Sequence, residues 1–147
     1  MAESSAPIPR VVETSSPNGA VVVLARLFFV LIFVLAAFND FSKPTIAYAA
    51  AQGVPLASIA VPLAGVLSIV GGFSILLGYR AKVGAWLIVL FLIPVTVLMH
   101  KFWGIADPHV AQDQMINFLK NASMLGGALL ITQFGAGPLS LDSRRAR

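Results

Sequence analysis

The chain has 147 residues, of which 58% are hydrophobic and only 11% are charged, and its mean hydropathy is +0.88. A soluble domain of this size would leave large apolar patches in water, so the composition excludes an ordinary soluble protein and favours one surrounded by membrane lipids. The absence of cysteine excludes disulfides, thiol redox centres and iron–sulfur clusters held by the chain itself. The net charge of +4 comes without a contiguous basic patch, so we expect no nucleic-acid partner.

Four apolar stretches are long enough to cross a membrane as helices. A hydrocarbon core of about 30 Å needs about 20 residues, because an α-helix rises about 1.5 Å per residue. Residues 1–19, rich in Ser and Pro, are predicted to form a mobile tail, followed by a transmembrane domain over residues 20–137 and a basic tail over residues 138–147. The four spans are predicted at residues 20–38, 55–77, 83–99 and 114–134.

The connections between these stretches predict an up-down antiparallel four-helix bundle. The link at 78–82 is short, and segments 39–54 and 100–113 are expected to be loops at the opposite end. The end that holds both termini and the short link carries six of the ten Lys and Arg residues, and the other end carries two. This asymmetry predicts that the N and C termini are cytoplasmic, because basic residues gather on the cytoplasmic side of membrane proteins.

Polar side chains gather at the outward ends of three predicted spans. Polar groups are costly in hydrocarbon, so we expect these side chains to converge into one outward-facing ligand pocket, with Asp40 as the partner of the Lys120 ammonium. The alternative is that the lysines extend to the interface and the asparagines only hold helices together. The predicted ligand-binding residues are Asp40, Lys43, His100, Asn117, Lys120 and Asn121.

Arg26 is a second intramembrane charge, about two helical turns inside the cytoplasmic end. No acidic residue is expected in the inner half of any span. We therefore predict that Asp142 folds back from the C-terminal tail to contact Arg26, which would tie the tail to the bundle. The alternative is an arginine that extends to the membrane surface.

Several sequence runs resemble the DoxX family of small bacterial inner-membrane proteins. The runs are residues 99–103 (MHKFW), 115–121 (MINFLKN), 126–127 (GG) and 135–142 (GAGPLSLD). Nearer the N-terminus, Arg26, Lys43 followed by Gly53-Val54-Pro55, and Gly78-Tyr79-Arg80 resemble the same family. The resemblance covers about residues 20–143.

This resemblance implies a multi-pass protein of the bacterial inner membrane and an association with redox systems. DoxX members include a subunit of a thiosulfate:quinone oxidoreductase and components of oxidative-stress complexes with superoxide dismutase and a sulfurtransferase. Association with a family does not fix a function, because unrelated activities share folds.

Three functions remain open from the sequence. The first is a redox-associated subunit that binds a quinone-like ligand, with His100 and Lys120 donating to its carbonyl oxygens; it would be an enzyme only as part of a quinone-linked oxidoreductase. The second is a non-catalytic anchor or assembly subunit that recruits soluble enzymes, and the third, less favoured, is a small-solute pathway. The chain shows no flavin, haem or metal motif, so quinone is the one cofactor considered. A homo-oligomer and a redox-enzyme partner both stay open.

Overall fold

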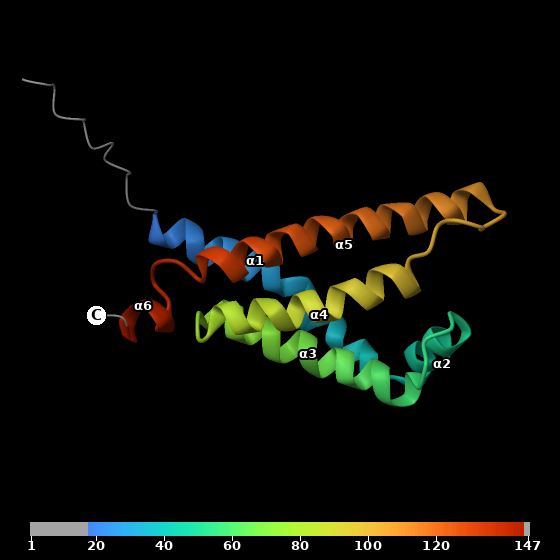
Figure 1. The fold of residues 1–147 in the computed structure, drawn as a ribbon, viewed down its shortest axis with the longest axis horizontal. Coiled ribbons are helices and arrows are strands. Elements are labelled where there is room, and N and C mark those ends of the chain that lie inside the picture. Colours follow the sequence, from blue (N-terminus) through green and yellow to red (C-terminus); the bar gives the residue numbers. More distant parts are fainter. Residues whose placement is uncertain (1–17, 146–147) are drawn as a thin grey trace, which may run out of the picture.

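The computed structural model describes residues 18–145, and all secondary structure in this part of the chain is helical (Figure 1). Residues 1–17 of the expected N-terminal tail lie outside the described residues. The long helices are α1 (Gly19–Ala37), α3 (Ala57–Leu77), α4 (Ala81–Met99) and α5 (Pro108–Phe134). The short helices are η1 (Phe38–Phe41), α2 (Lys43–Ala51) and α6 (Leu141–Arg145).

Three of the helical segments are long and apolar enough to cross a membrane. They are Gly19–Phe41, Ala57–Leu77 and Ala81–Met99. α5 is longer, with 27 residues, but its N-terminal half carries several polar side chains and it does not qualify by composition. The prediction of an all-helical membrane protein is confirmed at this level.

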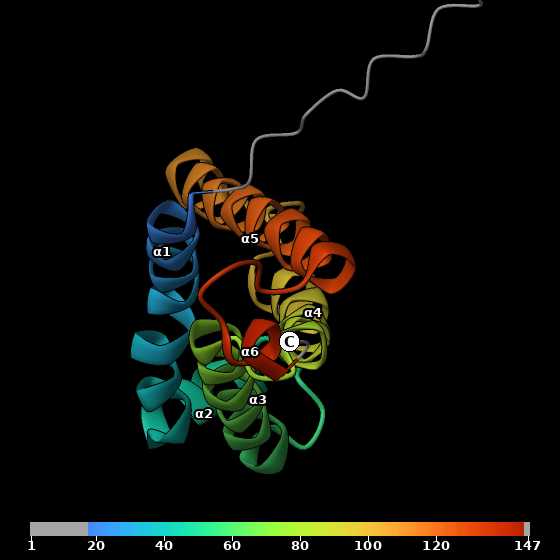
Figure 2. The ribbon, with the colours of Figure 1, turned by 90° about the vertical axis from the view of Figure 1, so that its left-hand side faces the viewer.

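The long helices pack in the order α1, α3, α4, α5 (Figure 2). Their shared core is made of aliphatic and aromatic side chains, whereas most large apolar residues on the outside are exposed, as expected for a surface in contact with lipid. The buried core residues are Val30, Phe33, Ile75, Ala85, Ile88, Val89, Leu92 and Ala128.

The backbones of α3 and α4 approach each other closely at two glycines. A Cβ atom on Gly71 would lie 2.8 Å from the carbonyl oxygen of Gly84, and one on Gly84 would lie 2.9 Å from that of Gly71. In a membrane the hydrophobic effect does not drive helices together. Close packing of two backbones therefore supplies the van der Waals attraction that holds the helices in contact. The α3–α4 pair therefore forms the central contact to which α1 and α5 are added.

The prediction that residues 39–54 form a loop is wrong. The chain continues from α1 into η1, turns at Ser42 and then forms α2. The Ser42 hydroxyl accepts a hydrogen bond from the Thr45 N–H, Pro44 stands in the first turn, and alanines make up most of the rest of α2. A helix cap, a proline in the first turn and several alanines together favour a short helix. The prediction considered only long apolar stretches and therefore missed it.

α5 begins six residues earlier than the expected start at residue 114. The Asp107 carboxylate accepts hydrogen bonds from the N–H groups of His109 and Val110, and Pro108 occupies the first turn. These are standard helix-start signals, so the polar residues after Pro108 belong to the helix and not to the preceding loop.

We predict that Gly71→Ala lowers the free energy of unfolding by about 1–3 kcal/mol, because the added methyl group would press on the backbone of α4. Gly126→Ala is the matched control, since a Cβ at this helical position meets nothing within 4 Å. Unfolding in mixed detergent micelles, followed by circular dichroism, measures both variants. Equal stability of the two variants would contradict the close contact of α3 and α4.

Candidate functional site

Two adjoining cavities lie toward the end of the molecule where η1 and α2 are found. One, here called the apolar cavity, has a volume of about 220 Å³, and the other, the polar cavity, has a volume of about 300 Å³. Asp40, Phe91, Val95 and His100 line both. The two spaces therefore share walls and form one candidate site.

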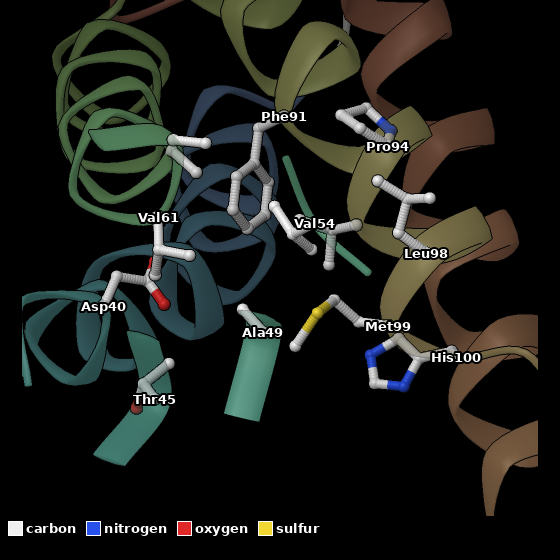
Figure 3. Close-up of a pocket in the computed structure, with 13 residues that line it drawn as sticks. Asp40, Thr45, Ala49, Val54, Val61, Phe91, Pro94, Leu98, Met99 and His100 are labelled. Carbon is white, nitrogen blue, oxygen red and sulfur yellow. The ribbon is translucent and has the colours of Figure 1, made fainter. Parts of the chain in front are cut away.

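The apolar cavity is enclosed by η1, α2, α3 and α4 (Figure 3). Asp40 and Thr45 lie on one side, Met99 and His100 lie on the other, and Phe91 stands between them. The remaining lining residues are apolar: Ala49, Val54, Ala60, Val61, Ala64, Pro94, Val95 and Leu98. An apolar space with a few polar groups at its edges is the usual form of a small-molecule site.

The polar cavity lies between α1 and α5, over the outer part of α4. α1 contributes Ile32, Phe33 and Ala36, while α5 contributes most of the hydrogen-bonding groups. The polar lining residues are Asp40, Ser68, His100, Asn117, Lys120 and Asn121.

The polar cavity exists because α1 and α5 diverge. The two helices meet where Phe29 packs at Gly127, at which a Cβ would lie 2.9 Å from the Phe29 ring. Toward η1 they separate, and among the described residues they share no extended contact like those of α1 with α3 or α4 with α5 (Figure 1). The polar cavity is lined from both helices in the region where they separate.

Asp40 is held in place by the close packing of η1 on α3. A Cβ on Gly65 would lie 3.0 Å from the Asp40 Cβ and 3.2 Å from the Phe41 ring, so the glycine is what allows this approach. Within residues 18–145 the Asp40 carboxylate accepts no hydrogen bond and forms no ion pair, although it is partly buried. A partly buried carboxylate without a donor is costly, so its oxygens are available to a ligand or water.

Asn117, Lys120 and Asn121 on α5 present amide and ammonium groups to the same space. Lys120 Nζ donates to Asn117 Oδ1 over 3.4 Å, and this is its one hydrogen bond among the described residues. Asn121 is 8% exposed and its amide has no partner in residues 18–145, yet it lines the polar cavity. These groups leave both donors and acceptors free to contact a ligand.

His100 connects the site to α5. Its Nδ1 lies 3.0 Å from Gln114 Oε1. An amide oxygen can only accept, so this pairing places a proton on Nδ1 and leaves Nε2 of the neutral ring as an acceptor. With Asp40 and Lys120, the site then offers two acceptors and one strong donor.

Five of the six predicted site residues line the polar cavity; Lys43 does not. The expectation that Lys43 shares a face with Asp40 required the first helix to continue, but the chain turns at Ser42 and Lys43 becomes an exposed residue at the start of α2. The expected Asp40–Lys120 pair is also wrong, since no ion pair joins them in the described structure, where they lie on η1 and α5.

Sequence reasoning missed several residues of the site. Ser68 lines the polar cavity and donates from its hydroxyl to the Phe33 carbonyl oxygen over 2.9 Å, while Gln114 orients His100. Thr45 reaches the apolar cavity because α2 folds back beneath η1. The capping pattern of Ser42 and Thr45 was the one sequence signal that could have placed Thr45.

Arg26 and Asp142 both fasten the C-terminal tail, but not by contacting each other. Within residues 18–145, Arg26 Nη2 donates to the Leu139 carbonyl oxygen over 2.8 Å, and Nε and Nη1 have no acceptor. Asp142 instead accepts from the N–H groups of Arg80 and Ala81, over 2.8 and 2.9 Å, at the start of α4. The predicted Arg26–Asp142 contact is wrong because the Leu139 carbonyl oxygen is the acceptor for Arg26, whereas the Asp142 carboxylate caps the start of α4.

Arg26 is also not an arginine that extends to the surface, since it is only 5% exposed. Its Nη1 lies against Gly78, where a Cβ would be 2.5 Å from that nitrogen and would also clash with Ser140. Gly78 has a φ of +64°, a conformation that glycine adopts readily. The turn between α3 and α4 therefore leaves room for both the arginine and the tail.

Comparisons with known proteins identify the family. The model of the SURF4 family matches residues 2–147. Inner membrane protein YphA of Escherichia coli is 32% identical over 124 residues, which cover 83% of this chain and 88% of YphA. The ER-derived vesicles protein ERV29 of Saccharomyces cerevisiae is 31% identical over 81 residues, which cover 54% of this chain but only 26% of ERV29. No solved structure gives a significant match.

The assignment to the DoxX family is therefore wrong, since the family match over nearly the whole chain is to SURF4. The runs that suggested DoxX consist largely of glycine and apolar residues, which membrane helices of many families use for packing. The redox association came only from that resemblance and loses its basis with it.

We predict that Asp142→Ala releases the tail from the α3–α4 turn and lowers the free energy of unfolding by about 1–3 kcal/mol, because two backbone N–H groups lose a charged acceptor. Limited trypsin digestion should then cleave faster at Arg144 and Arg145. Asp113→Ala is the control, since Asp113 is exposed and makes no hydrogen bond among the described residues. Unchanged digestion of Asp142→Ala would show that the tail is held by other contacts.

Proposed function

The chain belongs to the SURF4 family, and we propose that it binds a lipid-soluble molecule with a polar head group in its apolar and polar cavities. The observation that carries the proposal is the unpartnered Asp40 carboxylate, which faces the same space as Lys120 and Asn121. Polar groups at membrane depth are retained at a cost, so a carboxylate that has no partner among residues 18–145 is best explained by a ligand that pairs with it.

The proposal includes four membrane crossings, with α5 as the fourth. α5 would be about 40 Å long at about 1.5 Å per residue, and three of its polar residues, Asn117, Lys120 and Asn121, line the polar cavity, which lowers the cost of a span with low hydrophobicity. Four crossings place the start of α1, the α3–α4 turn and the tail at one end. Two contacts support this: Leu139 packs at Gly19, and the Asp142 N–H donates to the Gly78 carbonyl oxygen over 2.7 Å.

The orientation and the membrane follow from charge and from a relative. We propose that the end with the α3–α4 turn is cytoplasmic, because it carries six of the ten Lys and Arg residues. YphA is named an inner membrane protein of Escherichia coli, which supports the bacterial inner membrane as the location. The ligand site then lies in the outward half of the bilayer.

The chemistry of the site defines the ligand class. A head group that both donates and accepts hydrogen bonds fits best, since Asp40 and His100 Nε2 accept while Lys120 donates. An apolar body would occupy the apolar cavity. A quinol, whose hydroxyls donate and accept, belongs to this class, and so do other lipids with a hydroxyl-bearing head.

A second candidate is a non-catalytic membrane anchor. Its support is the exposed basic cluster of Arg80, Lys82, Arg144 and Arg145 around the proposed cytoplasmic end, which could hold an acidic soluble partner. The name of ERV29 ties that relative to vesicles and not to an enzymatic reaction. Loss of a co-purifying protein on substitution of Arg144 and Arg145, with ligand binding intact, would favour this function.

A solute pathway has less support. Between the polar cavity and Arg26, the described part of the bundle is filled by the apolar core of Val30, Phe33, Ile75 and Ile88. A polar solute would meet no hydrogen-bonding group along that length.

We predict that Lys120→Gln removes a lipid-soluble molecule that co-purifies with the wild-type protein, because the site loses its ammonium donor. The measurement is native mass spectrometry of protein extracted gently from its own membrane, with the bound molecule identified after organic extraction. Lys43→Gln is the matched control, since Lys43 lies outside both cavities, and it should retain the molecule.

A titration with a short-chain quinone and its quinol tests separately whether the ligand is a quinol. Tighter binding of the quinol, reduced about tenfold in Asp40→Asn, would place quinols within the ligand class. A wild-type protein that carries no bound molecule and responds to neither compound would refute ligand binding at this site.

A further inference from the structure

A third cavity lies at the opposite end of the molecule from the ligand site. It has a volume of about 730 Å³ and is lined by residues from the first turn of α4, the end of α5 and the tail that leads into α6. Its basic lining residues are Arg80 and Lys82. Lys82 extends across the loop after α5, where a Cβ on Gly135 would lie 3.6 Å from its Cε.

The cavity is electrically positive although one carboxylate lines it. Both oxygens of Asp142 accept hydrogen bonds from backbone N–H groups, so the carboxylate caps α4 and forms no ion pair with Arg80 or Lys82 in the described structure. The hydroxyls of Ser140 and Ser143 bond to each other's backbone. Two cationic side chains are thus left for an external anion.

The surroundings of the cavity are apolar and face the lipid. Val83 and Phe134 line it and are 56% and 80% exposed, and Trp86, one turn further along α4, is 54% exposed. The cationic groups therefore stand where a helix end meets the lipid-facing surface. This is the depth at which phosphate groups of a bilayer lie above the first methylenes of the acyl chains.

We propose that this cavity binds the head group of an anionic phospholipid, with the phosphate between Arg80 and Lys82 and an acyl chain along Val83 and Phe134. The guanidinium and ammonium groups supply charged donors to the phosphate oxygens. The apolar side chains favour a lipid over free phosphate, which would gain nothing from them. This inference requires the membrane location but not the ligand proposed for the other end of the molecule.

Quenching of Trp86 by brominated lipids tests the proposal. Trp103→Phe leaves Trp86 as the one tryptophan, because the chain has two. This variant is placed in phosphatidylcholine vesicles that contain either dibrominated phosphatidylglycerol or dibrominated phosphatidylcholine. We expect at least about a fivefold preference for phosphatidylglycerol, since each basic residue near the surface attracts an anionic lipid by about that factor.

Substitutions in the same background identify the residues responsible. Lys82→Gln should lower the preference severalfold, and Arg80→Gln with Lys82→Gln should abolish it. Lys43→Gln, at the opposite end, should leave it unchanged. Because Lys82 is exposed and makes no hydrogen bond among the described residues, the single variant keeps the test valid if the double variant is unstable.

Three results would overturn the proposal. Equal quenching by the two brominated lipids, or a preference that survives Lys82→Gln undiminished, would show that the cavity does not select anionic lipid. Inorganic phosphate that reduces the preference more than chloride of the same ionic strength would assign the cavity to a soluble anion instead.

Discussion

The close contact of α3 and α4 at Gly71 and Gly84 is the constraint on which the other helices depend. Two backbones that touch leave no freedom in their spacing, so α3 and α4 act as one rigid pair. α1 packs on one member and α5 on the other, and nothing comparable joins α1 to α5 along their outer halves. The candidate ligand site is the space that this arrangement leaves open, and it is therefore a property of the helix packing and not of a loop.

The sequence predicted the membrane class and the positions of the apolar helices well, because twenty consecutive apolar residues have few alternatives to a span. It also predicted that Asp40, His100 and polar side chains of α5 would lie together, since polar residues at the same membrane depth avoid lipid by facing the interior of the bundle. Prediction failed where short-range capping decided the outcome. Ser42 turned the chain into α2 and removed Lys43 from the site, while Asp107 lengthened α5.

The partners of the buried charges could not be predicted for a different reason. Charge pairing favoured Asp142 for Arg26 and Asp40 for Lys120, but the one acceptor that Arg26 has in the described structure is a backbone carbonyl oxygen, that of Leu139. The carbonyl of Leu139 is placed by a residue with φ of +53°, a local conformation that no sequence pattern signalled. The family was misjudged for a related reason: small residues that pack helices are shared by many membrane proteins.

The attachment of the tail has a consequence for the order of folding. Leu139 and Asp142 follow the four long helices in the sequence, yet they supply the acceptor for Arg26 and the cap of α4. Both acceptors leave the ribosome after every helix of the bundle has been made. Until residues 139–142 have been made, the Arg26 guanidinium lacks the acceptor that they provide, so the bundle can close around this charge only after the segment that follows α5 has been synthesised.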